Sequence, residues 1–234
     1  MKKITSLFFA ATVLLASAAQ AQTADEIVNK HIDALGGKEK LAQLKSVYTE
    51  SSVEVMGNQA PSVEYLLEGK GFKSETEFNG SKIIQCYTDK GGWMVNPMAG
   101  AVDPQAMPDE AYKAGKGQIN FGGALLDYAA KGNKVELLGK DGNNYKLKVT
   151  SGSIESNYFI DATTYLISKI TSKAEMMGQS VDVVISFSDY KKTDFGITVP
   201  YTRDTDFGSF ALSSKVSKVE INKEIDPKIF EMTK

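Results

Sequence analysis

From residue 47 onward, apolar and polar residues alternate along most of the chain, and this alternation predicts β-strands. In the first such segment Val53 and Val55 fall on one face, whereas Glu54 falls on the other. Turn signals such as Asn79-Gly80 separate successive segments. The pattern predicts an antiparallel meander of about eleven strands with one polar face.

An amphipathic helix is expected before the first strand. Thr23 and Glu26 have the spacing of a capping box, in which a hydroxyl and a carboxylate satisfy the first backbone N–H groups of a helix. Gly36 and Gly37 are suited to end this helix. Its apolar stripe consists of Ile27, Val28, His31, Ile32 and Leu35. A shorter helical piece through Leu41 and Leu44 is expected to follow.

Residues 97–133 interrupt the alternation. This insertion holds three of the six prolines (Pro97, Pro104 and Pro108) and several glycines, so it is poorly suited to being a strand although it is apolar. We expect it to form short, mobile helices. Long connections in compact domains tend to be functional, so we interpret the insertion as a lid over an apolar cavity. The alternative is a pair of ordinary helices that plug an open barrel end as permanent core.

The predicted fold class is mainly β, with a curved antiparallel sheet that forms an incomplete barrel. A barrel of more than about eight strands is too wide for its own side chains to fill. The N-terminal helix and the insertion are therefore expected to cover the concave side. Two domains are possible, but a single domain over residues 22–234 is the simpler interpretation because no linker divides the chain.

Residues 1–21 have the pattern of a secretory signal peptide. Lys2 and Lys3 form the charged end, an apolar stretch follows, and Ala19-Gln20-Ala21 is a small-residue cleavage pattern. No later segment approaches the roughly 18 consecutive apolar residues of a membrane span. The mature chain is therefore expected to be a soluble protein of the periplasm.

Composition narrows the classes of partner. The formal net charge is −2, and Arg203 is the one arginine among lysines that are spread along the chain. Bidentate arginine contacts to phosphate and base edges are therefore scarce, and nucleic acid is not an expected partner. Cys86 is the one cysteine, so no disulfide can form within the chain, and its place in a strand pattern indicates a packed thiol.

Candidate catalytic groups are few, and we predict no catalytic residue, no metal and no cofactor. His31 is the sole histidine and lies on the apolar stripe of the first helix, where a structural role is expected. One histidine and one cysteine do not supply a zinc site. Asp204 and Asp206 have the spacing of a glycosidase pair or a calcium site, but a solvated turn is the simpler interpretation.

Four segments together resemble the LolA-like family of periplasmic carriers that sort outer-membrane lipoproteins. They are residues 23–37, which precede Leu41 and Leu44, Gly92-Trp93-Met94-Val95-Asn96-Pro97, Phe187-Ser188-Asp189-Tyr190 with Gly196, Ile197 and Pro200, and Ile225-Asp226-Pro227 with Phe230. The resemblance implies an eleven-stranded half-barrel, covered by helices, whose concave apolar face binds acyl chains. Characterised carriers also latch the lid through an arginine, whereas this sequence has Gly69-Lys70-Gly71-Phe72 in the comparable stretch.

Two functions are kept open. The first is a non-catalytic, monomeric carrier for lipid or for the acyl chains of lipoproteins, and the second is an envelope sensor or interaction domain that docks a protein partner, such as an inner- or outer-membrane protein. For the carrier, apolar residues of the sheet and of the insertion are the predicted ligand-binding set. This set is Val53, Val55, Tyr65, Leu67, Phe72, Trp93, Val95, Met98, Met107, Ile119, Phe121, Leu125 and Leu126.

Overall fold

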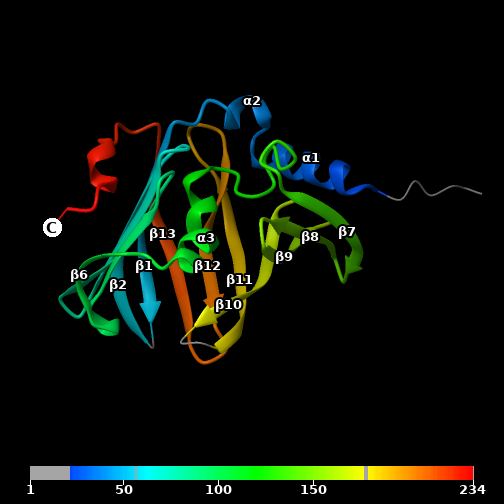
Figure 1. The fold of residues 1–234 in the computed structure, drawn as a ribbon. Coiled ribbons are helices and arrows are strands. Elements are labelled where there is room, and N and C mark those ends of the chain that lie inside the picture. The colour runs from blue at the N-terminus through cyan, green and yellow to red at the C-terminus, as the bar shows by residue number, and fades with distance from the viewer. Residues whose placement is uncertain (1–21, 56, 177–178, 234) are drawn as a thin grey trace, which may run out of the picture.

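A computed structural model describes residues 22–55, 57–176 and 179–233 (Figure 1). The predicted signal peptide, residues 1–21, lies outside the described residues. The strands are β1 (Ser46–Val55), β2 (Asn58–Leu67), β3 (Gly71–Phe78), β4 (Ser81–Thr88), β5 (Gly92–Asn96), β6 (Ala101–Ala106), β7 (Lys134–Asp141), β8 (Asn144–Ser151), β9 (Ile154–Asp161), β10 (Ile167–Met176), β11 (Gln179–Lys192), β12 (Thr198–Asp206) and β13 (Ala211–Ile221). The helices are α1 (Ala24–Leu35), α2 (Lys38–Leu41) and α3 (Asp109–Gly115), with 3-10 helices η1 (Pro97–Ala99), η2 (Lys116–Ile119) and η3 (Pro227–Phe230).

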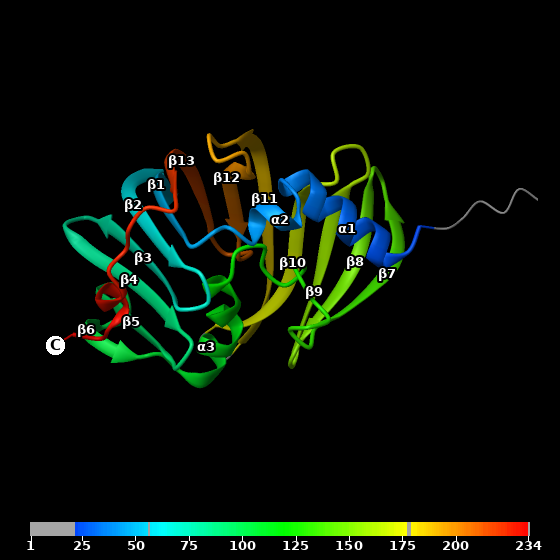
Figure 2. The same ribbon diagram turned by 90° about the horizontal axis from the view of Figure 1, so that it is seen from above.

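The described strands form one antiparallel sheet with the order β6-β5-β4-β3-β2-β1-β13-β12-β11-β10-β9-β8-β7. Consecutive strands are neighbours except β6 and β7, and at the middle of the sheet β1 pairs with β13, which joins the first and last strands of the chain. The sheet curves around the helices without closing, so β6 and β7 remain as edges (Figure 2). The expected mainly-β, incomplete barrel is confirmed, and the sheet is continuous.

The sheet has 13 strands among the described residues, which is more than the expected eleven. One of them, β6, lies within the insertion, where the sequence predicted no strand. Pro104 falls in this strand, and β6 is an edge. A proline is tolerated in an edge strand because the missing N–H is not needed by a second neighbour.

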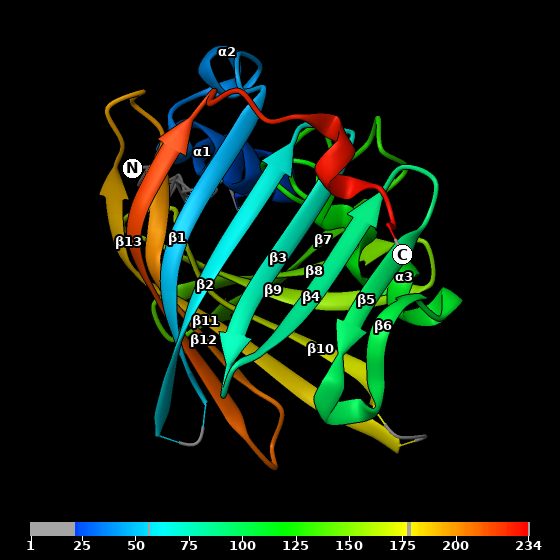
Figure 3. The same cartoon turned by 90° about the vertical axis from the view of Figure 1, so that its left-hand side faces the viewer.

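Strand alternation gives the sheet an inner and an outer face. Tyr87 of β4 lies on the inner face, in a cluster with lid residues, whereas the adjacent Cys86 lies on the outer face beside η3. Figure 3 shows η3 in front of the β3–β5 region while α1 lies behind the sheet. The two faces are therefore covered by different ends of the chain.

On the inner face, α1 covers the end of the sheet that contains β7 to β9 (Figure 2). The capping box of Thr23 and Glu26 is present as expected, and the predicted apolar stripe of α1 is buried. Ile27 packs in one cluster with Leu147 of β8 and Ile160 of β9, and all three side chains are 0% exposed. This core fixes α1 to the sheet.

On the outer face, η3 covers β3 to β5. The Phe230 side chain packs with Trp93, Val95 and Cys86. The Phe230 carbonyl oxygen accepts a hydrogen bond from Trp93 Nε1 at 2.8 Å and a longer one from Cys86 Sγ at 3.5 Å. Burial raises the pKa of the Cys86 thiol to about 12, which agrees with the packed thiol that the sequence predicted.

Within the described ranges, no helix combines the length and the apolar composition that crossing a membrane requires.

Candidate functional site

The insertion, residues 97–133, which we call the lid, leaves the sheet after β5 and returns to it at β7. It contains η1, β6, α3 and η2, followed by a series of turns through residue 132. In Figure 1, α3 lies in front of the central strands, and its Tyr112 and Gly115 contact Thr88 and Tyr87 of β4. The lid therefore consists of short elements as expected, apart from β6.

The first half of the lid, which ends at residue 121, is attached to the strand connections at one rim of the sheet. The Gly69 N–H donates to the Ile119 carbonyl at 2.8 Å, and the Phe121 N–H donates to Glu68 Oε2 at 2.6 Å. Burial raises the pKa of Glu68, and the hydrogen bond from Phe121 partly opposes this effect. The Tyr112 hydroxyl donates to the Thr88 carbonyl at 2.9 Å. The Met107 N–H also donates to the Gly92 carbonyl at 2.8 Å, and β6 pairs with β5. Packing adds to this attachment.

That packing centres on Tyr87, which together with Phe72 and Met107 forms a small inner cluster beneath α3. Gly115, at the end of α3, lies so close to the Tyr87 ring that a Cβ atom there would be 2.2 Å from it. Gly115 is therefore required for this close approach.

The second half of the lid belongs to the α1 core. Leu125 is 1% exposed and packs in the same cluster as Ile27, with Leu126 at its margin. The Tyr128 hydroxyl donates to Asp25 of α1, and Lys38 Nζ lies 2.6 Å from Asp127 Oδ1. This half therefore packs into the core, as the plug alternative required, although it consists of turns and not of helices.

A pocket of about 280 Å³ lies between the lid and the central strands. Its floor comes from the inner faces of β1, β2, β3, β11, β12 and β13, and Gln118 and Phe121 of the lid border it. Its other lining residues are Val47, Thr49, Ser51, Glu64, Leu66, Phe72, Phe187, Val199, Pro200, Arg203, Ser214, Val216 and Val219. The lining is largely apolar, and it contains one ion pair, in which Arg203 Nη2 lies 2.7 Å from Glu64 Oε1.

The predicted ligand-binding residues fall into separate places. Phe72 and Phe121 line the pocket, while Met107 and Ile119 pack beside it in the Tyr87 cluster. Val53 and Val55 continue the inner face toward the β1–β2 turn, because they alternate with the same parity as Ser51. Leu125 and Leu126 belong to the α1 core, and Met98 is 69% exposed. Tyr65, Leu67, Trp93 and Val95 lie in the outer cluster with Phe230.

Sequence reasoning missed several lining residues. On β2, Glu64 and Leu66 line the pocket on the inner face, whereas Tyr65 and Leu67, which were predicted to do so, lie on the outer face. The predicted inner face of β2 is therefore off by one residue. The sequence analysis did not connect Phe187, Val216 or Arg203 with the site. Their signal was the alternation in β11 to β13, which becomes informative only when the sheet order is known.

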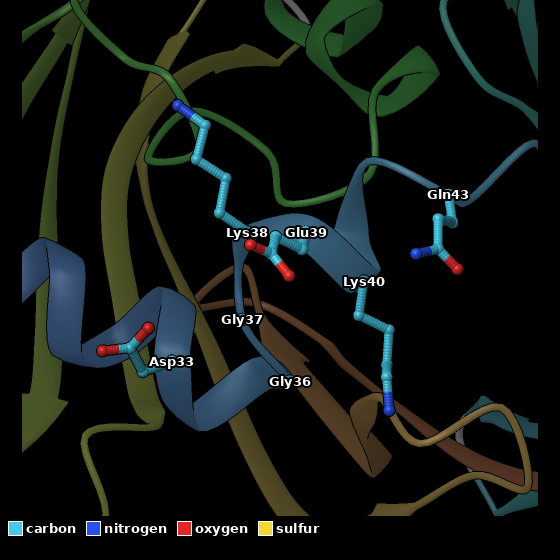
Figure 4. A pocket seen from close by; sticks show the side chains of 7 residues that line it. All are labelled: Asp33, Gly36, Gly37, Lys38, Glu39, Lys40 and Gln43. Atoms are coloured by element: carbon cyan, nitrogen blue, oxygen red, sulfur yellow. The ribbon is translucent and has the colours of Figure 1, made fainter.

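A second hollow, of about 450 Å³, lies where α1 meets α2 (Figure 4). It is lined by Asp33, Gly36, Gly37, Lys38, Glu39, Lys40 and Gln43. In Figure 4 the side chains of Lys38, Lys40 and Asp33 point in different directions and do not converge. This hollow is lined by charged, amide and glycine residues without a set of polar groups aimed at one point, so it is not the candidate site.

The residues weighed for catalysis have structural surroundings. His31 is buried, and its Nδ1 lies 2.8 Å from the Tyr165 carbonyl oxygen. Asp204 accepts a hydrogen bond from the Ser213 hydroxyl, and Asp206 accepts one from the Gly208 N–H in the β12–β13 turn. Over the part of the chain that the structure describes, no group of three His, Cys, Asp or Glu residues is placed to hold a metal ion.

Comparison with solved structures decides the fold family. A DUF1329 family protein from Desulfovibrio piger superposes with a TM-score of 0.59 and 14% identity over 90% of this chain and 98% of that chain. A LolA superfamily protein from Nitrosomonas europaea gives a TM-score of 0.59 and 10% identity over the same shares. The chain has a LolA-like fold.

A third LolA-like structure is a putative outer membrane lipoprotein-sorting protein domain from Vibrio parahaemolyticus. It gives a TM-score of 0.54 and 12% identity over 88% of this chain and 94% of that chain. The sequence itself matches no protein-family model and no curated protein. At these identities the LolA-like likeness concerns the fold, and the function has to be argued from the site.

Proposed function

We propose that this protein is a non-catalytic carrier of the periplasm that holds an acyl chain in the pocket between the lid and the central strands. The observation that supports this proposal is the pocket itself. A largely apolar hollow is left open on the inner face between the Tyr87 cluster beneath α3 and the core that α1 forms with the second half of the lid. The LolA-like fold is consistent with such a role.

The size of the pocket favours a single chain. Its volume of about 280 Å³ is near the lower end of small-molecule sites, which begin at about 300 Å³. A twelve-carbon chain would gain roughly 9 kcal/mol from burial before the costs of association are subtracted. Several chains of one acylated lipoprotein would fit only if the first half of the lid moved away from the sheet.

Binding of a neutral fluorescent probe tests the carrier proposal. The mature protein is titrated with N-phenylnaphthylamine, and wild type is compared with Val216→Phe, which adds bulk to the pocket floor. We expect saturable binding in wild type and a loss of about tenfold or more in affinity in the variant, because the ring occupies the volume that the probe needs. Lys215→Phe is the matched control, since Lys215 is the exposed neighbour in β13.

Two results would contradict the carrier. One is the absence of saturable binding by wild type, and the other is binding that Val216→Phe leaves unchanged while the far-UV circular dichroism of the variant stays native.

The second candidate function is docking of an envelope protein. It is favoured by the free edge strand β6, where Val102 is 67% exposed, and by Met98, 69% exposed, just before it. An edge strand offers unpaired backbone groups to an added strand. Native mass spectrometry of the protein purified from its own envelope separates the two functions, because bound lipid supports the carrier and a stoichiometric protein partner supports docking.

A further inference from the structure

Several polar groups of the pocket lie on neighbouring strands, where Phe187 and Val216 also line the floor. Arg203 of β12 and Ser214 of β13 are direct register partners, and Ser51 of β1 lies one strand further along the floor. Glu64 of β2 reaches Arg203 across the two intervening strands, and the two charged groups are 2.7 Å apart. A polar patch of four side chains therefore crosses the floor of the pocket.

Part of the apolar lining lies farther along the strands, beneath the lid, where polar residues are fewer. On β12, Val199 precedes Arg203 by four residues, and on β1, Val47 precedes Ser51 by four. Four residues of a strand span about 13 Å. Leu66, Phe72 and Phe121 complete this apolar end. The pocket thus has one end that carries Arg203, Ser51 and Ser214 among apolar neighbours and another end that is apolar, separated by about the length of several methylene groups.

Two hydroxyls at the end of the pocket that carries Arg203 lack partners. Ser51 is 9% exposed and Ser214 is 8% exposed, and both line the pocket. Within the described part of the chain, neither hydroxyl hydrogen-bonds to another protein group. Among the described residues, Asn96 Oδ1 is the one fully buried side-chain N or O atom without a partner, so the Ser51 and Ser214 hydroxyls reach solvent in the pocket. These two are available to a bound molecule.

The Arg203 guanidinium also has N–H donors that its ion pair with Glu64 does not use. A guanidinium carries five N–H donors, and Glu64 Oε1 is hydrogen-bonded to Nη2. The Arg203 side chain is 43% exposed and the Glu64 side chain is 22% exposed, so the pair is open to the pocket. The remaining donors can receive an oxyanion in the paired geometry that arginine favours.

A purely apolar ligand would be poorly matched to this floor. It would remove water from the ion pair and from the two hydroxyls and return no hydrogen bonds, which is costly. A carboxylate or phosphate at the end of the chain would supply acceptors for Arg203, Ser51 and Ser214 in place of water. An oxyanion head and one acyl tail therefore fit the two ends of the pocket.

We propose that the ligand is a single-chain amphiphile whose oxyanion head, a carboxylate or a phosphate, is bound by Arg203, Ser214 and Ser51 while its tail lies under the lid. This inference rests on the carrier function proposed above. Glu64 holds the guanidinium in place and competes with the head for it. Removing Glu64 and removing Arg203 should therefore act in opposite directions, which a purely structural ion pair would not do.

The test uses ligands with one tail and different heads. Dodecanoate, dodecyl phosphate and dodecanol, each below its micelle concentration, displace N-phenylnaphthylamine from the mature protein. In wild type, we expect one of the two anions to bind about tenfold or more tighter than dodecanol, because hydrogen bonds to a charged group are stronger than neutral ones. The tighter anion identifies the head as carboxylate or phosphate.

Four variants assign the preference to residues. Glu64→Gln should tighten the preferred anion, and Arg203→Met should weaken it about tenfold without changing dodecanol. The double variant Glu64→Gln/Arg203→Met removes both charges, so it leaves no unpaired charge that could itself disturb folding. It should show no preference for either anion. Lys215→Met removes a cation from the neighbouring exposed position and should behave as wild type.

Equal affinity for all three ligands in wild type would overturn the head-group proposal while leaving the carrier intact. The same conclusion follows if Glu64→Gln and Arg203→Met weaken the anion and the alcohol alike. Failure of the neutral probe and of dodecanol to bind at all would instead remove the carrier proposal.

Discussion

His31 illustrates how burial sets the chemistry of one residue. Its side chain is 2% exposed on the face of α1 that meets the sheet, and Nδ1–H donates to the Tyr165 carbonyl. Burial lowers the pKa of His31, and the hydrogen bond to Tyr165 only partly offsets this. The imidazole is therefore neutral in the folded protein at pH values where an exposed histidine is already charged.

The stability of the protein should consequently depend on pH through His31. In the unfolded chain its pKa is about 6.5. Below that pH the unfolded state binds more protons than the folded state, so the free energy of unfolding falls as the pH falls from 6.5 toward the lowered folded pKa. Above 6.5 both states are neutral, and His31 contributes no slope.

Urea unfolding at pH 7.5, 6.5 and 5.5 measures this effect. We expect wild type to lose up to about 1.4 kcal/mol per pH unit more than His31→Gln over the lower interval, because glutamine can donate to Tyr165 without titrating. Parallel pH profiles for the two proteins would show that His31 does not titrate as inferred.

Alternation along a strand also decides which face of the sheet each residue occupies. The residues of β2 show why the sequence alone leaves this assignment ambiguous. Tyr65 and Leu67 were expected in the cavity, but they face η3, while Glu64 and Leu66 face the pocket. The outer face of β2 to β5 can be apolar because η3 covers it. A strand with two apolar faces gives no polar side by which its orientation can be recognised.

At the scale of elements, the lid has two halves that are held differently. Residues after η2 are built into the α1 core through Leu125, whereas α3 and η2 rest on the Tyr87 cluster with few polar contacts. Segments with fewer buried contacts open at lower free energy than those in a core. Opening for ligand entry is therefore expected at α3 and η2.

A glycine pair in the lid tests this division. Gly115→Ala places a methyl group against the Tyr87 ring, whereas Gly117→Ala, two residues on, meets no atom within 4 Å. Neither glycine has a positive φ. We expect faster hydrogen exchange over residues 109–121 in Gly115→Ala, unchanged exchange over residues 122–133, and wild-type exchange in Gly117→Ala.

Equal protection of residues 109–121 in both variants would mean that the Tyr87 contact does not hold the lid. Loss of protection across the whole chain in Gly115→Ala would mean that the two halves open together.

At the scale of the whole molecule, one sheet connects the two clusters that cover its ends. The β1–β13 pairing joins the β2–β6 side, where Trp93 and η3 lie, to the β7–β12 side, where α1 lies. No linker separates the sides, and each contributes strands to the floor of the pocket. The protein should therefore unfold as one cooperative unit.

Two probes of urea unfolding test this expectation. Trp93 is the single tryptophan and reports the outer cluster, while far-UV circular dichroism reports all strands. We expect the two transitions to coincide, which is the behaviour of a single cooperative domain. A Trp93 transition at lower urea than the dichroism transition would indicate two units and contradict the single domain.

The sequence by itself determined the local structure of this protein. The period-two pattern, the turns at Asn79-Gly80 and the capping box of Thr23 and Glu26 depend on neighbours in the chain, and they were sufficient to predict a curved antiparallel sheet with an N-terminal helix. The lid was also visible as a break in the pattern, although its strand β6 was not.

The tertiary structure alone decided where the pocket lies. Arg203 meets Glu64 only because β1 and β13 pair and bring distant strands onto one floor. Trp93 faces away from that floor and packs against Phe230, which returns to the outer face from the end of the chain. Such contacts join residues more than a hundred positions apart. No local periodicity carries their register, so a site built from both ends of the chain emerges only when the sheet is assembled.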